Sequence, residues 1–279
     1  DVEVLAQAPA RMIHSGIGDL ASKPVSNADW IVANRLTGST HSTEAAKVID
    51  ASWKLLDGVA PGLATRELEA VERLSASLIL SGFAMTVAGN SAPASGGEHL
   101  ISHYLDMVAV ADVTEHDLHG VQVGVATITA AFFYQKLMAL DPERIDIDRL
   151  TAALAPWEAH EALIRERFGT LAPAVLDHAK AGYPDADTLR SRLVALKDQW
   201  PEIVSDLNAT LRTPEAIEAE LASAGGPVRY RDLGVSRERA FRAIAHSRDI
   251  RPRYTILDLV WELGYLREWA TEAVERYYL

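Results

Sequence analysis

Residues 95–107 of the chain read SGGEHLISHYLDM, an apolar stretch with two histidines directly behind a pair of glycines. Apolar residues in this stretch recur at three- and four-residue spacing, which predicts a helix that begins just after the pair Gly96–Gly97. His99 and His103 stand four residues apart, so they share one face of that helix. Such a pair can bind a metal ion, but it is more often exposed or satisfied by hydrogen bonds. The spacing alone leaves both interpretations open.

The helical pattern continues along the chain in both directions. Helix-forming residues fill most windows, and only residues 2–5 and 228–230 show an alternating pattern that could form a strand. We therefore predict an all-α protein, with helix starts at caps such as Asn27 and Thr213 and a helix end at Gly89. The expected helices cover residues 8–22, 27–37, 41–58, 65–87, 97–111, 119–139, 148–153, 157–168, 171–182, 187–208, 213–224, 236–246 and 254–277.

The composition is that of a globular protein with a sizeable core. Of its 279 residues, 48% are hydrophobic and 24% are charged, and the formal net charge is −12. Lysine and arginine are scattered, which argues against nucleic acid as a partner. Cysteine is absent, which excludes thiolate metal sites and fits a cytoplasmic protein. No repeat or linker divides the chain, so we expect one helical domain over residues 1–279, with a soft internal boundary near 140–156.

Two long runs carry no charge, and both raise the question of a membrane. The run from Leu74 to Gly97 is interrupted by glycines, serines and a proline, and the run from Gly120 to Gln135 is shorter still. Neither reaches the ~20 apolar residues that a membrane span requires. We expect both runs to form helices buried on all sides, and no membrane partner.

Two further residues complete a candidate metal site. His119 stands at the start of the second uncharged run, and Asp19 follows a glycine in the segment SGIGDL. One aspartate and two histidines from three separate helices suit a divalent ion such as zinc, iron or nickel, with a position left open for a substrate. Glu98 and Asp106 flank the histidines of the central helix, where they could orient the imidazoles or face solvent.

Several motifs, in this order, resemble the glycerol-1-phosphate dehydrogenases. That family is grouped with glycerol dehydrogenase, the iron-type alcohol dehydrogenases and 3-dehydroquinate synthase. The similar segments are APARMIHSGIGDLASK (8–23) with NADW (27–30), SAPASGGEHLISHYLDM (91–107), LHGVQVG (118–124) and RDLGVSRERAFRAIAHSRDIRPRYTILDL (231–259). The first of them resembles the point where the family passes from its nucleotide-binding half into its helical half. The chain is thus similar to the C-terminal helical half of a dehydroquinate synthase-like two-domain fold.

The resemblance implies roles for individual residues. The metal ligands of the family fall on Asp19, His99 and His119. His103 falls near the substrate and the nicotinamide and is the candidate catalytic residue, with the proton of the reaction coming either from it or through water. Ser95 and Gly96 fall in the turn that lines the substrate pocket. The pair Arg251 and Arg253 also matches the family, but we interpret it as a helix start with solvated charges.

The reaction implied by the resemblance is a metal-assisted hydride transfer. NAD or NADP would exchange hydride between dihydroxyacetone phosphate and sn-glycerol 1-phosphate, with zinc, nickel or iron polarising the carbonyl. The α/β nucleotide-binding domain of the family has no counterpart here, since no GxGxxG pattern follows a strand. Its cofactor-binding residues are therefore not assigned, and a homo-oligomer or a partner chain that supplies this half is expected.

One departure from the family keeps other functions open. Ala92 stands where the family usually has an arginine, a natural phosphate clamp. A related polyol or ketone dehydrogenase is one alternative. A reaction of the 3-dehydroquinate synthase type is a second, although a glutamate typically replaces Asp19 there. The third is a non-catalytic helical binding module that has lost its nucleotide half.

Overall fold

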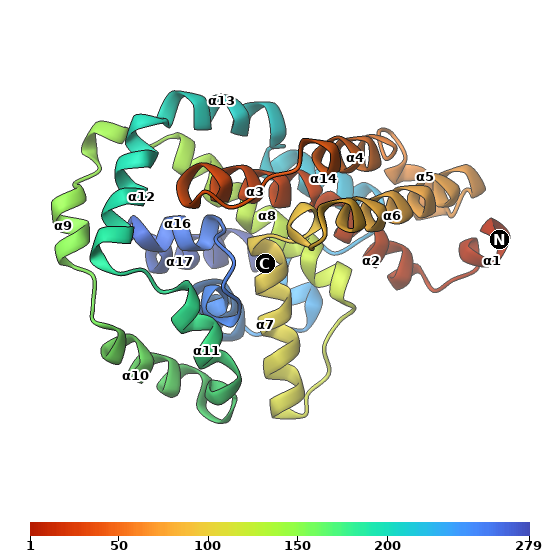
Figure 1. The fold of residues 1–279 in the computed structure, drawn as a ribbon. Coiled ribbons are helices and arrows are strands. Elements are labelled where there is room, and N and C mark those ends of the chain that lie inside the picture. The colour runs from red at the N-terminus through yellow and green to blue at the C-terminus, as the bar shows by residue number, and fades with distance from the viewer.

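The computed structural model describes all residues from 1 to 279 and consists of helices joined by turns, without a strand (Figure 1). The prediction of an all-α protein is confirmed. The helices are α1 (Val2–Ala6), α2 (Ala10–Ala21), α3 (Lys23–Thr37), α4 (Thr43–Lys54), α5 (Ala60–Thr65), α6 (Leu68–Ala88), α7 (Gly97–Asp112), α8 (His119–Met138), α9 (Ile147–Ala152), α10 (Trp157–Phe168), α11 (Ala172–Gly182), α12 (Ala186–Asp198), α13 (Trp200–Thr210), α14 (Pro214–Ser223), α15 (Arg237–His246), α16 (Ile256–Glu262) and α17 (Leu266–Tyr277). Short 3-10 turns are η1 (Ala92–Ala94), η2 (Pro142–Arg144), η3 (Gly169–Leu171), η4 (Tyr230–Leu233) and η5 (Ser247–Ile250).

Local hydrogen bonds explain where several helices begin and end. The predicted cap at Thr213 is confirmed, because its hydroxyl accepts a hydrogen bond from the amide of Ala216 at 3.2 Å. Gly89 ends α6 in the left-handed conformation, with φ of 70°. Asn27 is not a cap, since α3 already begins at Lys23 with a proline in its first turn.

Both candidate strands are wrong. Residues 2–5 form α1, where the carboxylate of Asp1 accepts a hydrogen bond from the amide of Glu3 and caps the helix. Residues 228–230 lead into η4. Two predicted long helices are each divided in two. The helix predicted over residues 187–208 is interrupted at Gln199, before the proline at the start of α13. The helix predicted over residues 254–277 is interrupted at Gly264, where φ is +81°.

Helix α8 forms the centre of the molecule. It is buried without interruption from Gly120 to Tyr134, as expected for this uncharged run. Helices α2, α7, α14 and α16 pack against it. In Figure 1, α1, α5 and α6 lie on the side of the N-terminus, and α9, α10 and α12 lie on the opposite side, with α7 and α8 between them. One hydrophobic core runs through both sides.

Helix α6 differs from the prediction of a helix buried on all sides. It packs against α2 and α4, but Ile79 is 73% exposed and Phe83 is 56% exposed. By length and composition α6 could cross a membrane, yet such a helix also occurs in the bundles of soluble proteins. Its contacts with α2 and α4 make it one wall of the helical bundle.

The backbones of α2 and α8 approach each other at glycines. A Cβ atom on Gly18 would lie 2.2 Å from the carbonyl oxygen of Gly120, and one on Gly120 would lie 2.1 Å from the carbonyl oxygen of Ser15. No side chain fits at these positions, because both contacts are with backbone that cannot rotate away. The contact brings Asp19, which follows Gly18, next to His119, which precedes Gly120.

We predict that Gly18→Ala or Gly120→Ala lowers the free energy of unfolding by about 3 kcal/mol, because either methyl group forces the two helices apart. Gly82→Ala in α6 is the matched control, since its Cβ would meet no atom within 4 Å. That control should stabilise the protein by ~0.5–1 kcal/mol through helix propensity. Urea unfolding of the three variants measures the difference. Equal effects at Gly18 and Gly82 would contradict the close contact.

Candidate metal centre

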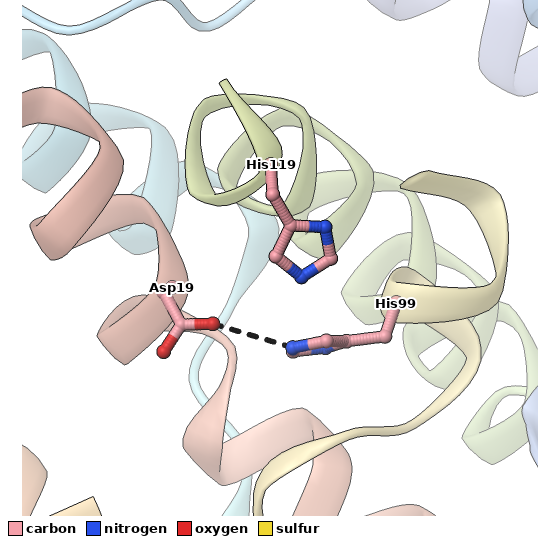
Figure 2. Close-up of side chains that lie close together, drawn as sticks. All are labelled: Asp19, His99 and His119. Atoms are coloured by element: carbon pink, nitrogen blue, oxygen red, sulfur yellow. Dashed lines mark hydrogen bonds and ion pairs between the residues drawn. The ribbon is translucent and has the colours of Figure 1, made fainter. Parts of the chain in front are cut away.

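Three helices each contribute one side chain to a compact cluster. Asp19 lies in the last turn of α2, His99 in the first turn of α7, and His119 is the first residue of α8. Figure 2 shows the three side chains pointing toward one another, and one ligand atom from each lies within 4.8 Å of the others. The structure thus brings together the three residues that the resemblance assigns as ligands.

The donor set and its spacing fit a divalent ion. Oδ1 of Asp19 lies 3.3 Å from Nε2 of His99. Ligands held at ~2.1 Å from one tetrahedral ion lie ~3.4 Å apart, so this pair already has the required separation. Carboxylate and imidazole donors are typical of zinc, iron or nickel sites, and three of them leave one tetrahedral position free.

Glu98 orients the imidazole of His99. The Glu98 side chain is fully buried, and its Oε1 accepts hydrogen bonds from Nδ1 of His99 and from the amide of Gly96, each at 2.8 Å. This contact leaves Nε2 of His99 facing Asp19, as in the carboxylate–histidine–metal arrangement. Burial by itself would lower the pKa of His99, but hydrogen bonds to Asp19 and Glu98 outweigh burial and raise it.

Lys23 holds the other oxygen of Asp19. Its buried ammonium lies 3.0 Å from Oδ2 of Asp19 and donates a hydrogen bond to the carbonyl of Ala94, also at 3.0 Å. Burial would raise the pKa of Asp19, but Lys23 and His99 outweigh it and hold this pKa well below its usual range. Asp19 therefore stays ionised and presents a single oxygen, Oδ1, to the cluster.

His119 is anchored through its other ring nitrogen. Oγ of Ser102 lies 3.0 Å from Nδ1 of His119, and a carboxylate oxygen of Asp106 lies 3.8 Å from the same atom. Gln122 donates a hydrogen bond to Asp106 at 2.7 Å and fixes that carboxylate. These contacts leave Nε2 of His119 available to an ion.

His103 lies beside the cluster rather than within it. Its ring stacks on that of His119 with the centroids 5.0 Å apart, while the His99 ring is 6.3 Å away. Burial, together with the neighbouring imidazoles of His119 and His99, lowers the pKa of His103 to about 4. The side chain is therefore uncharged at neutral pH. With Asp106 and His119 it forms a second group of closely spaced donor atoms.

The cluster opens into a hollow of about 350 Å³, which His103 and Ser95 also line. A second hollow of about 340 Å³ shares Ser95, Arg251 and Arg253 with the first, and Ala92 lines this second one. The prediction of solvated charges at the pair of arginines is wrong for Arg253, which is half-buried, although Arg251 is exposed. Helix α16 begins only at residue 256.

Gly96 lines neither hollow, and the structure gives another reason for a glycine there. A Cβ atom on Gly96 would lie 2.3 Å from Oδ2 of Asp29 and 2.8 Å from Oε2 of Glu98. Asp29 is buried and accepts hydrogen bonds from the hydroxyl of Tyr134 and the amides of Gly97 and residue 256. Burial and the nearby Glu98 carboxylate raise the pKa of Asp29. The predicted substrate contact of Gly96 stays a prediction.

Three residues around the site were missed or left undecided by the sequence. Lys23 stands four residues after Asp19, and this i,i+4 spacing was the only signal for their pairing. Glu98 directly precedes His99, and this position in the sequence does not show whether the carboxylate is buried or exposed. Arg253 carries no local signal for burial, since it follows Arg251 and Pro252 in a short segment without a helical or alternating pattern.

Comparison with known proteins identifies relatives along almost the whole chain. No family model matches. The chain is 30% identical over 267 residues to the glycerol-1-phosphate dehydrogenase (NAD(P)+) of Bacillus licheniformis, covering 95% of this chain and 53% of that protein. It is 30% identical over 263 residues to the enzyme of the same name from Bacillus velezensis, covering 94% and 54%. The match to that of Thermococcus sibiricus is 39% over 168 residues, covering 60% and 45%. The chain spans about half the length of the curated relatives it matches.

We predict that Lys23→Met lowers the free energy of unfolding of the metal-free protein by ~2 kcal/mol, because it leaves the Asp19 carboxylate without its cation. This value is below that for a fully buried pair, since Asp19 is partly exposed. The matched control is Lys54→Met, which breaks an exposed i,i+4 pair with Asp50 and should change stability by less than about 0.5 kcal/mol. Both variants are measured by urea unfolding in the presence of a chelator. Equal losses would show that Lys23 has no special role.

Proposed function

The chain is homologous to the glycerol-1-phosphate dehydrogenases over almost its whole length, and on that basis we propose that it provides the metal- and substrate-binding half of such an enzyme. The reaction would interconvert dihydroxyacetone phosphate and sn-glycerol 1-phosphate with NAD or NADP. The observation that carries this proposal is the convergence of Asp19, His99 and His119 from three helices on one hollow.

Asp19, His99 and His119 would hold the divalent ion, zinc in the first instance and nickel or iron as alternatives. When bound there, the ion would supply Lewis acidity that polarises the carbonyl of the substrate. Lys23 keeps Asp19 ionised and restricts it to one oxygen. Glu98 keeps Nε2 of His99 directed at the cluster.

His103 would transfer the proton that accompanies hydride transfer. Because its imidazole is uncharged at neutral pH, it can accept the proton of the substrate hydroxyl in the oxidative direction and return it in the reductive direction. Its stacking on His119 places it on the wall of the same hollow. Ser95 and Gly96 would form the turn against which the substrate lies.

The nucleotide would be bound outside these 279 residues, by another part of the same polypeptide or by a partner chain. The names of the relatives include NAD(P)+, and this chain covers only about half of those proteins. A cytoplasmic enzyme with a dehydroquinate synthase-like fold and a homo-oligomeric or two-chain assembly follows from the same proposal.

One observation favours a second candidate function. Ala92 lines the second hollow, where the family usually has an arginine, and an alanine offers a phosphate nothing to bind. A dehydrogenase for an unphosphorylated polyol or ketone would not need the arginine. The two candidates share the metal site and differ only in whether the substrate carries a phosphate.

We expect the purified protein to hold one zinc, nickel or iron ion per chain, and His99→Ala to abolish this binding, because the variant loses one of three ligands. His178→Ala is the control, since His178 is exposed on α11 and lines neither hollow. Elemental mass spectrometry and circular dichroism are run on all three proteins. Metal retained in His99→Ala with unchanged helix content would refute the ligand assignment. A wild type that stays metal-free after reconstitution would favour the non-catalytic module.

Metal binding is expected to weaken as the pH falls below neutral. The ion requires an unprotonated His99, and the raised pKa of this residue means that protons compete at a higher pH than at an ordinary histidine of pKa about 6.5. Bound metal is measured after dialysis at steps from about pH 8 to about pH 5. Full occupancy at the acid end of this series would contradict the expectation.

A further inference from the structure

We propose that Arg251 and Arg253, in the segment that leads into α16, bind the phosphate group of the substrate. The inference rests on the proposed function and assigns the anionic end of the substrate to named residues. It also explains how a chain with Ala92 in the family's arginine position can still accept a phosphorylated substrate.

Arg253 is tied to the turn that precedes the metal-binding helix. Its guanidinium donates one hydrogen bond to the backbone carbonyl of Ser95 and another, at 2.8 Å, to the hydroxyl of Ser91. Ser91 is the neighbour of Ala92 in the chain. The guanidinium of Arg253 therefore contacts the same loop in which Ala92 replaces the arginine that is usual in the family. Two contacts to one turn fix the guanidinium relative to His99, which lies four residues after Ser95.

Neither arginine is neutralised by a carboxylate. No aspartate or glutamate oxygen lies within 4 Å of Arg251 or Arg253, although neighbouring arginines are paired. Arg192 pairs with Glu262 at 2.7 Å, and Arg248 pairs with two aspartates. Two unpaired cations at one place in a protein of net charge −12 make a local positive field suited to an anion.

The charges that line the hollow beside Asp19, His99 and His119 also favour an anion. Its cationic residues are Lys23, Arg251 and Arg253, and its only carboxylate, Asp19, is already paired with Lys23. The surplus positive charge thus belongs to the two arginines. A guanidinium also offers a planar fork of donors that matches phosphate oxygens, which an ammonium does not.

The position of the arginines suits a small substrate with its carbonyl at the metal ligands. Arg251, Arg253 and Ser95 line both hollows and so form the boundary between them. A phosphate there would lie beside the metal ligands rather than in a separate pocket. The phosphate groups of the nicotinamide nucleotide are a second source of the same chemistry, and the experiment must separate the two sources.

The test is calorimetric titration of the zinc-loaded 279-residue protein with sn-glycerol 1-phosphate, glycerol or NADH. Arg253→Ala and Arg251→Ala should each weaken binding of sn-glycerol 1-phosphate by ~10- to 100-fold, the loss expected for a hydrogen bond to a charged group. Binding of glycerol should not change, and NADH should show no binding that depends on the arginines, since the proposed nucleotide site lies outside these residues. Arg253→Lys should recover part of the loss, since it restores the charge without the fork.

A matched control is Arg144→Ala, since Arg144 is 87% exposed and lies in η2. This variant should bind sn-glycerol 1-phosphate as the wild type does. Circular dichroism confirms folding, and if Arg253→Ala fails to fold, Arg251→Ala and Arg253→Lys carry the test.

Metal content, measured on the same samples, distinguishes failure of the phosphate site from failure of the proposed function. Metal-loaded wild type whose affinity for sn-glycerol 1-phosphate is absent, or is unchanged in the arginine variants, overturns the phosphate site and leaves the metal site standing. NADH binding by this chain that is lost in the arginine variants, with binding of sn-glycerol 1-phosphate unchanged, also overturns it, because the arginines would then bind the nucleotide. Arginine-dependent binding of sn-glycerol 1-phosphate by a protein that takes up no metal would support the phosphate site while the proposed function fails.

Discussion

The contact between Gly18 of α2 and Gly120 of α8 sets the geometry on which the candidate site depends. Each glycine is followed or preceded directly by a candidate ligand, Asp19 in one helix and His119 in the other. Because backbone meets backbone there, with no side chain between, peptide packing fixes how far apart the backbones that carry these two ligands lie. The third ligand, His99, comes from α7, which packs against α8 in turn.

Paired charged side chains around the Gly18–Gly120 contact hold the candidate ligands in place. Lys23 contacts Asp19, and Glu98 contacts His99. Asp29 lies behind them and connects α3 to α7, α8 and α16 through three hydrogen bonds. Buried carboxylates in such numbers are costly unless each is paired or protonated. Their concentration beside Asp19, His99 and His119 is typical of a functional site, although structural ion pairs such as that of Arg248 with Asp249 are buried elsewhere in the core.

Patterns of spacing were enough to predict the all-α fold and most helices, because the signals for them are local. The cap at Thr213 and the glycine at the end of α6 are of this kind. The exposed face of α6 could not be predicted, because a run without charges does not reveal which side lacks a neighbour. For the site, spacing placed His99 and His103 on one helix face, but only the resemblance to a family selected His99 with Asp19 and His119. The burial of Arg253 depends on a turn more than 150 residues away in the sequence.

Lys23 has a consequence for how the proposed site would acquire an ion. An ammonium that already neutralises Asp19 lets the three ligands stand in place while the ion is absent, so folding need not wait for metal. Loading would then be a late and reversible event, open to exchange with the ions that the surroundings supply. A site of this kind has little means of refusing a competitor by shape, and affinity alone would rank copper first. The identity of the resident ion would then be decided by cellular supply as much as by the protein.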